Sequence, residues 1–298
     1  MKSLLRFSVL FLISSCFLSH FSWARQNVAS PDSSLGQWSP EVVGRLAGSQ
    51  VGFQNWAEGG VNTLAFSVGV DGKTERDRGG WQQKIAGKLS FGLVKQDTLS
   101  FRKAEDLIRF SVTLNYNGNG FLDKIHPTIA FQARTQFASG FNFVKNPFGD
   151  GRTPPVKVSA FMSPGTFTQS VGMTYQVRPW ISQRLGVGAK ETVVTLAKLR
   201  RLYNLDPKES VRYEVGLEAF TDFDKELFKN VFVKSTLGLF AAFNTPESPD
   251  LIWENVVNMK VNSWLQVNLE WSVLYDKDVS TKAQLKEVFS VGISYHIL

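Results

Sequence analysis

Cysteine is almost absent from this sequence, which contains one, Cys16, in 298 residues. Cys16 lies in an N-terminal segment with the features of an export signal, so we expect the mature chain to have no thiol. Disulfides, thiolate catalysis and cysteine-based metal sites are therefore excluded together. An alternative follows from the position of Cys16 after Ile13-Ser14-Ser15, which resembles a lipobox. In that case Cys16 would be a lipidated residue.

Long apolar runs are also absent beyond this N-terminal segment. Lys2 and Arg6 supply its basic start, residues 4–18 are largely apolar, and Ser22-Trp23-Ala24 resembles a cleavage site. No later run approaches the ~20 apolar residues of a spanning helix, so membrane insertion would have to use β-strands. A mean hydropathy of −0.10 is compatible with this, because such strands alternate polar and apolar residues.

Histidine is the third scarce residue, and only His126 and His296 follow the export signal. No Gly-x-Ser-x-Gly elbow and no phosphate-binding loop is present. We therefore expect no catalytic residues, no metal and no cofactor. The formal net charge of +7 comes from scattered basic residues on an exported chain, which argues against nucleic acid as a partner.

What the chain does contain is repeated alternation of apolar and polar residues. In the last ten residues Phe289, Val291, Ile293 and Tyr295 share one face of an extended strand, opposite smaller or polar residues. The pattern is clearest over residues 108–117. Similar segments separated by turn residues recur from residue 46 onward and give about twelve strands, an even number as in bacterial single-chain barrels.

The fold class predicted is all-β: an antiparallel up-and-down transmembrane β-barrel of about twelve strands. Residues 1–24 are expected to be a signal peptide and residues 46–298 the barrel. Between them, residues 25–45 contain two Ser-Pro pairs and are expected to be a periplasmic linker. Phe289, Tyr295 and Leu298 belong to the terminal strand, which would pair with the first to close the sheet.

The predicted connections alternate in length. Short links occur at residues 118–124, 178–179, 225–229 and 262–263, and longer ones at residues 96–105, 138–160, 197–209, 244–250 and 276–283. In outer-membrane barrels the short turns are periplasmic, so both termini are predicted to be periplasmic. Outer-membrane lipid and, during insertion, the barrel-assembly machinery are the expected partners.

The polar face of the strands is expected to line a wet lumen, because unpaired charges in a dry core would each cost several kcal/mol. A soluble periplasmic ligand-binding barrel, with its apolar face inward, is an alternative that typically closes at about eight strands. The lumen-lining candidates are Lys84, Lys88, Arg109, Arg134, Arg212, Glu214, Glu218, Lys234, Glu254, Lys260 and Glu270.

The chain also contains several longer motifs in a fixed order. They are Asn55-Trp56-Ala57-Glu58-Gly59-Gly60, Gly92-Leu93-Val94-Lys95-Gln96, Arg102-Lys103 with Glu105-Asp106, Thr135-Gln136-Phe137-Ala138, Trp253-Glu254 with Asn258-Met259-Lys260, Tyr275-Asp276 and Lys286-Glu287-Val288-Phe289. With these motifs the chain resembles a known family of exported bacterial proteins, domain of unknown function 3078. The resemblance implies an outer-membrane-type barrel with no established activity. The chain departs from such barrels in ending on Leu298 rather than on an aromatic residue.

The loop over residues 138–160 is the main functional candidate outside the strands. Phe141, Phe143 and Phe148 lie in it, together with glycine-rich turns and Pro154-Pro155. Such a loop either folds inward as a constriction, projects toward a partner, or is a disordered surface loop.

The function predicted is that of a non-catalytic outer-membrane barrel, either a pore for small polar solutes or an envelope scaffold. A small excess of basic lumen residues predicts a weak preference for anionic solutes. The alternative is an outer-membrane lipid-modifying enzyme, which needs a serine and a carboxylate to converge on His126 or His296 at the rim.

Overall fold

The structure is a computed structural model that describes residues 36–52, 61–280 and 282–297. The predicted signal peptide, Cys16, the first part of the linker, the Asn55–Gly60 motif and Leu298 lie outside the described residues.

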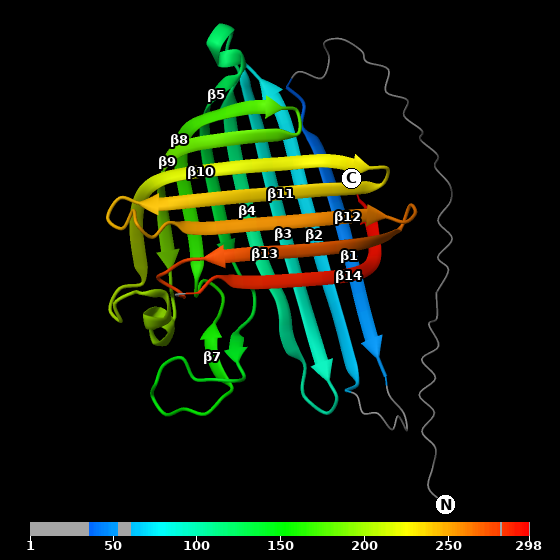
Figure 1. The fold of residues 1–298 in the computed structure, drawn as a ribbon, viewed down its shortest axis with the longest axis vertical. Coiled ribbons are helices and arrows are strands. Elements are labelled where there is room, and N and C mark those ends of the chain that lie inside the picture. Colours follow the sequence, from blue (N-terminus) through cyan, green and yellow to red (C-terminus); the bar gives the residue numbers. More distant parts are fainter. Residues whose placement is uncertain (1–35, 53–60, 281, 298) are drawn as a thin grey trace, which may run out of the picture. The chain divides into compact units, whose positions relative to one another are not determined.

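Twelve antiparallel strands close into one barrel, and each strand pairs with its neighbour in the chain (Figure 1). The predicted fold class is therefore confirmed. The strands are β1 (Ser39–Val51), β2 (Thr63–Arg78), β3 (Trp81–Gln96), β4 (Arg102–Tyr116), β5 (Ile125–Thr135), β8 (Gly165–Arg178), β9 (Ile181–Val193), β10 (Val211–Phe228), β11 (Val231–Ala242), β12 (Asp250–Lys260), β13 (Leu265–Tyr275) and β14 (Gln284–His296).

The first strand begins earlier than predicted. β1 starts at Ser39, so the expected linker boundary at residue 45 is wrong for residues 39–45. The Ser39-Pro40 pair suggested a linker. Pro40 is instead the second residue of β1, and proline is tolerated near the start of a strand. Residues 39–51 pair with β2 along their whole length, from Ser39 opposite Glu75 to Val51 opposite Thr63.

The apolar side chains point outward from the barrel. Phe110 and Leu269 are 42% and 37% exposed, whereas the neighbouring polar residues Asn115 and Asn268 are buried. A soluble barrel with an apolar interior would show the reverse, so that alternative is wrong. An exposed apolar surface on every strand is what a barrel presents to lipid. Among the described residues, no helix has the length and apolar content that a membrane crossing requires.

Connections at one end of the barrel are short. The β2–β3 turn, which the sequence reading missed, consists of Gly79 and Gly80, both at positive φ, where glycine has no steric penalty. The β4–β5 connection contains the 3-10 helix η1 (Gly120–Asp123). The first residue of β1 and the last residue of β14 lie on this side of the barrel. Ser39 pairs with Glu75 near the end of β2, and His296 pairs with Val43.

Connections at the opposite end are long and partly folded. The one from β5 to β8 carries a separate two-stranded sheet, β6 (Gly140–Asn142) with β7 (Val156–Ser159), which extends beyond the barrel strands (Figure 1). The one from β9 to β10 carries the 3-10 helix η2 (Ala197–Tyr203). The predicted alternation of short and long connections is therefore present.

The barrel closes where β14 pairs with β1, and Gly292 makes this approach possible. A Cβ atom at Gly292 would collide with the carbonyl oxygen of Leu46 and would lie 2.9 Å from the Cβ of Ala47. No side chain fits there without displacing backbone.

We predict that Gly292→Ala destabilises the barrel, because overpacking at a backbone contact typically costs about 1–3 kcal/mol. Gly48→Ala is the matched control, since its added Cβ would make only an ordinary 3.7 Å contact with Ala65. The measurement is the temperature at which the folded band is lost on gel electrophoresis. Equal stability of the two variants would contradict close approach at Gly292.

Candidate functional site

All eleven lumen-lining candidates lie on the inward face of their strands. The apolar residues that alternate with them along each strand face outward. On β10, for example, Tyr213, Val215 and Leu217 are exposed and alternate with the charged residues Arg212, Glu214 and Glu218. The inward charges form ion pairs at several heights in the barrel. The most informative of these pairs join strands that are far apart in the ring.

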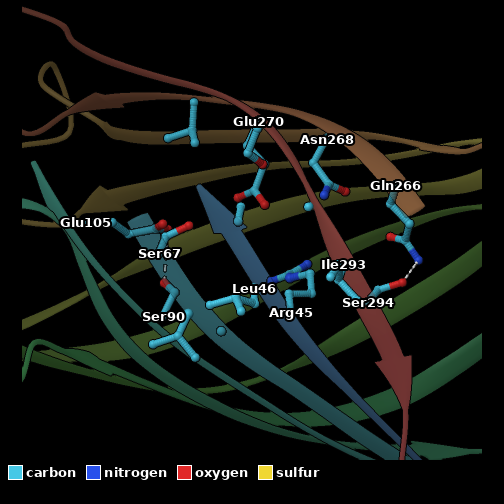
Figure 2. A pocket seen from close by; sticks show the side chains of 16 residues that line it. Arg45, Leu46, Ser67, Ser90, Glu105, Gln266, Asn268, Glu270, Ile293 and Ser294 are labelled. Carbon is cyan, nitrogen blue, oxygen red and sulfur yellow. Dashed lines mark hydrogen bonds between the residues drawn. The ribbon is translucent and has the colours of Figure 1, made fainter. Parts of the chain in front are cut away.

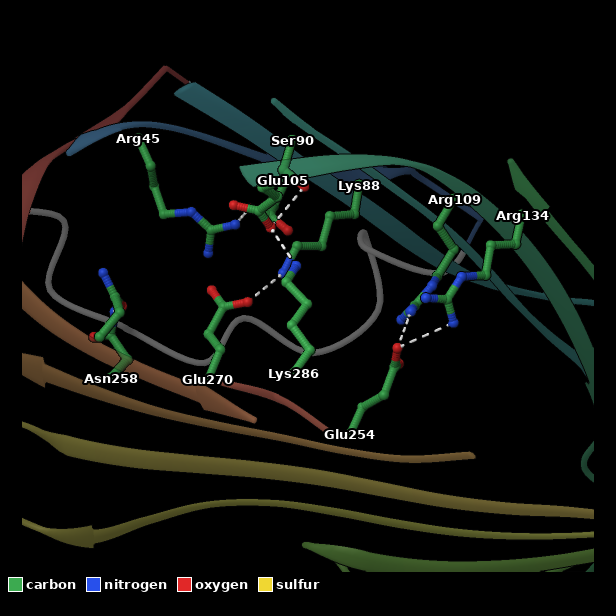
Figure 3. Close-up of polar contacts among 12 residues, drawn as sticks. Arg45, Lys88, Ser90, Glu105, Arg109, Arg134, Glu254, Asn258, Glu270 and Lys286 are labelled. Carbon is green, nitrogen blue, oxygen red and sulfur yellow. Dashed lines mark hydrogen bonds and ion pairs between the residues drawn. The ribbon is translucent and has the colours of Figure 1, made fainter. Parts of the chain in front are cut away.

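Glu254 on β12 is held by two arginines from the other side of the barrel (Figure 3). Its Oε1 accepts a hydrogen bond from Nη2 of Arg109 on β4 and lies 3.5 Å from Nη1 of Arg134 on β5. In the ring of twelve strands, β4 and β12 are six strands apart and therefore directly opposite. The two walls of the barrel thus meet through side chains at mid-height.

Two further contacts cross the lumen beside this one (Figure 3). Lys88 Nζ on β3 donates to Glu270 Oε2 on β13 at 3.0 Å, and these strands are four apart in the ring. Glu105 on β4 accepts from Ser90 Oγ at 3.0 Å and from Lys286 Nζ on β14 at 3.2 Å. The Lys88–Glu270 and Lys286–Glu105 pairs each restrain two strands that share no backbone hydrogen bonds, whereas Ser90 and Glu105 lie on the adjacent strands β3 and β4.

These bridges limit the width of the lumen. A circular barrel of twelve strands, spaced about 4.8 Å apart and tilted by about 40°, would be about 24 Å across. An arginine and a glutamate at full extension can join Cα atoms no more than about 15 Å apart. The barrel is therefore flattened where Arg109 meets Glu254, and side chains occupy the lumen there.

Charge in this bridge is unbalanced, because two guanidinium groups share one carboxylate. All three side chains are only partly exposed. Breaking a desolvated pair by removing one partner leaves an uncompensated charge, which can cost about 3–5 kcal/mol when burial is deep. Removal of Glu254 would leave two facing positive charges, whereas removal of the arginines would leave a single negative one.

A second group of charges lies near the long-loop end. Lys190 Nζ is 2.9 Å from Glu214 and also pairs with Asp250, which lies three strands away on β12. Arg212 pairs with Glu214 at 3.1 Å and with Asp278 of the β13–β14 loop at 3.0 Å. These contacts tie a long loop to the lumen wall.

The remaining predicted residues either form ion pairs with an adjacent strand or, in the described part of the chain, have no carboxylate partner. Glu218 lies 3.1 Å from Arg184 on the adjacent strand, and Lys84 is 3.8 Å from Glu75 with both side chains half-exposed. Lys260 lies over the ring of Phe232 at 4.8 Å. Within the described residues, Lys234 has no ion pair.

Several residues that face the lumen are not among the predicted ones. Arg45 lies in the segment expected to be a linker, although it pairs with Asp71. Glu105 and Lys286 lie within the family motifs and also face the lumen. The alternation could have identified them, because Arg45 continues the inward series of Glu41 and Val43 on β1.

Residues 49–141 match a known family, described as protein of unknown function (DUF3078). The resemblance predicted from motifs is confirmed over this segment. It includes the motifs at residues 55–60, 92–96, 102–106 and 135–138. The motifs between residues 253 and 289 lie outside the match. No curated protein matches this chain.

Three solved structures match this chain at low similarity. The translocator domain of the autotransporter NalP from Neisseria meningitidis is 9% identical, with a TM-score of 0.36 over 87% of this chain and 88% of that one. An outer membrane channel from Pseudomonas putida F1 is 9% identical, with a TM-score of 0.37 over 90% and 98%. The NanC porin is 9% identical, with a TM-score of 0.35 over 85% of this chain and 97% of that one. Similarity at this level carries no argument about activity.

The long loops pack against one another as a layer, as the hydrogen bond from Tyr203 to the Val158 carbonyl shows. The Asp106 carboxylate accepts the backbone N–H groups of Phe137 and Ala138 at 2.7 and 2.8 Å, and it pairs with Lys103 at 3.0 Å. This anchors the start of the residue 138–160 loop on β4. A small core is formed by Leu199 of η2 with Val194 and Leu205 of the flanking chain.

The three phenylalanines of this loop lie in two environments. Phe148 packs against the small core and is covered by the guanidinium of Arg152 at 4.5 Å. Phe141 and Phe143 are exposed, with ring centroids 6.3 Å apart, and Arg102 lies 4.0 Å over Phe143. Arg102 lies opposite Val94, past the bulge between Gly92 and Leu93, and so falls on the inward face of the β3–β4 pair. The constriction expected from this loop stays a prediction.

His126 has no catalytic partners. Its Nδ1 is buried without a hydrogen bond, and the nearby Thr128 hydroxyl contacts the His126 carbonyl and the side chains of Asn115 and Thr174 instead. Within the described residues, no serine and carboxylate converge on His126. The side chain of His296 lies outside the described residues. No group of residues in the described part of the chain is suited to hold a metal ion.

Tyr203 provides a test of the loop layer. Its hydroxyl donates to the Val158 carbonyl at 2.8 Å, and burial raises its pKa from 10.0 to about 12. The raised pKa means that the packed layer is favoured while Tyr203 is neutral, so this stabilisation is present below pH 10 and is lost as the pH rises through about 12.

We predict that ultraviolet titration of the folded protein shows one tyrosinate appearing only near pH 12, and that Tyr203→Phe removes this late component. Tyr213→Phe, on the outer wall, is the control and should retain it. A titration curve unchanged by Tyr203→Phe would show that Tyr203 is not buried as described.

Proposed function

We propose that this chain is a non-catalytic outer-membrane β-barrel whose lumen is a narrow, charged passage for small polar solutes, restricted by ion pairs between opposite walls. The observation that carries this proposal is the bridge of Arg109 and Arg134 to Glu254. A pore without such contacts would keep its opposite walls apart. Here, any solute must pass beside these three side chains or separate them.

The outer face supports the location. Apolar side chains cover all twelve strands, and the chain carries an N-terminal segment with the features of an export signal. With short turns in the periplasm, as in other bacterial barrels, both ends of the barrel chain are periplasmic and the loop layer is extracellular. Insertion of such a barrel requires the barrel-assembly machinery of the outer membrane.

The unequal charge at the bridge supports a preference for anions. Two guanidinium groups and one carboxylate give a local net charge of +1 at this bridge. Rings of positive charge select anions in pores by lowering the energy of the ion in transit.

A scaffold function is favoured by a different feature, the ordered loop layer. Phe141, Phe143 and Val144 are exposed on a hairpin that is anchored to β4 through Asp106. Exposed apolar side chains on a packed loop are suited to contact another envelope protein. This function does not require conduction.

We predict that Glu254→Gln increases single-channel conductance in planar bilayers severalfold and shifts the reversal potential toward anion selectivity. The variant releases Arg109 and Arg134, whose like charges then repel. The double variant Arg109→Gln/Arg134→Gln should also conduct more, but with selectivity shifted toward cations, because Glu254 remains.

Glu75→Gln is the matched control. Glu75 is also a lumen-facing glutamate, but it pairs only with Lys84 on the adjacent strand, so its loss should leave conductance unchanged. If none of these proteins conducts, the passage does not exist and the scaffold function stands. Equal effects of Glu75→Gln and Glu254→Gln would show that the bridge is not the constriction.

A further inference from the structure

The seam between β1 and β14 is shorter than the two strands that form it. Only five residue pairs join them, from Val43 opposite His296 to Ala47 opposite Gly292. β1 pairs with β2 over thirteen positions and β13 with β14 over ten. If the seam kept its register, residues 48–51 would face residues 288–291. Four pairs are therefore missing, which corresponds to an unpaired stretch of the seam about 13 Å long on the long-loop side.

Exposure along β1 agrees with the end of this pairing. Residues 48–51 of β1 are exposed at every position, whereas residues 288–291 of β14, which would face them, alternate between half-buried and exposed. In a strand paired on both sides, exposure alternates between the two faces, as it does in residues 64–70 of β2. Exposure therefore indicates a free edge on β1 above the Ala47–Gly292 pair, and on β14 the free edge is indicated by the end of the pairing.

A small cavity lies on the lumen side of the seam (Figure 2). Its volume is about 30 Å³, enough for one or two water molecules. The lining combines lumen-facing polar residues, including Arg45, Glu105 and Glu270, with the outward-facing residues Leu46 and Ile293. A polar lumen and a lipid-facing wall thus meet at one place in the barrel.

Free strand edges need partners in a membrane. An unsatisfied backbone N–H or C=O group in hydrocarbon costs several kcal/mol, which is why membrane barrels normally close without an edge. At this seam, the groups of residues 48–51 and 288–291 can be satisfied by water from the lumen or by polar atoms of a bound molecule. The apolar side chains on the outer side, Phe289 and Val291 among them, remain in contact with lipid.

We propose that the β1–β14 seam is a lateral binding site for a membrane lipid, with its acyl chain between the two strand edges and its polar head directed into the lumen. This proposal rests on the membrane location proposed above. The head would meet Arg45, Ser90 and Lys286 on the lumen side. Lys286 is half-exposed, and Glu105 keeps its hydrogen bond with Ser90 if Lys286 turns to a lipid phosphate.

An added β-strand from a partner fits the seam less well. The free edge of β1 offers four residues, which is shorter than the typical strand of about five to six. The opening also ends at the Ala47–Gly292 pair, where Gly292 packs directly on β1. An acyl chain needs no backbone register and can enter an opening that is closed at one end.

The test is photocrosslinking in nanodiscs of phosphatidylcholine that contain a lipid with a tail diazirine, followed by peptide mapping. We expect labelling of outward-facing residues on all strands and, in addition, of the lumen-facing residues Ser49 and Ser290 at the seam. Ser111 and Gln132 are the internal control, because they also face the lumen but lie on the fully paired β4–β5 seam.

A crosslinked double variant tests whether the lipid reaches the lumen through the β1–β14 seam. Ser49→Cys/Ser290→Cys, bridged by a short bismaleimide, should abolish lumen labelling while outward labelling persists. Ser111→Cys/Gln132→Cys, treated in the same way, should change nothing. Absence of lumen labelling in the unmodified protein, or labelling that survives the bridge, would overturn the lateral site.

The two proposals fail separately in this experiment. Loss of all outward labelling would contradict the membrane location itself. Outward labelling without seam labelling contradicts only the lateral site. Slow amide exchange at residues 48–51 together with absent seam labelling would indicate a bound strand and would overturn the proposal in favour of a protein partner.

Discussion

The ion pair between Arg109 and Glu254 is the contact on which the rest of the structure depends. It joins β4 to β12, which lie on opposite sides of the ring, and Arg134 adds a second cation from β5. Backbone hydrogen bonds determine only which strands are neighbours. The distance between opposite walls is set by side chains, and here charged side chains draw the walls together into a flattened barrel.

This constraint explains why the lumen is charged and yet narrow. A desolvated charge needs a partner, and the inward face supplies carboxylates and cations at matching heights on facing walls. The outer face has the opposite requirement, because lipid offers no hydrogen bonds. Each strand meets both requirements through simple alternation, so one period-two pattern serves a polar interior and an apolar exterior.

The seam is where these requirements conflict. The chain must join its first and last strands, and it does so over five pairs with Gly292 packed against β1. Above them the barrel has free edges next to the cavity lined by Arg45 and Glu270. The short seam and the bridged lumen therefore meet at this cavity.

Alternation in the sequence was sufficient to predict the twelve strands, their inward and outward faces and the lumen side of residues such as Lys88 and Glu270. These properties follow from the geometry of a single strand, in which successive side chains point to opposite faces. It was insufficient at Ser39 and at Arg45, where a Ser-Pro pair at the strand start resembled a linker.

Which charges meet could be decided only by the tertiary structure. Arg109 and Glu254 are 145 positions apart and share no local pattern, so their contact depends on the closure, tilt and flattening of the whole ring. The extent of the β1–β14 seam has the same origin, because alternation predicts which face a residue occupies but not how far two strand edges remain together. By itself, therefore, the sequence determined the kind of barrel and the polarity of its two faces, whereas closure in three dimensions decided the width of its lumen and the length of its seam.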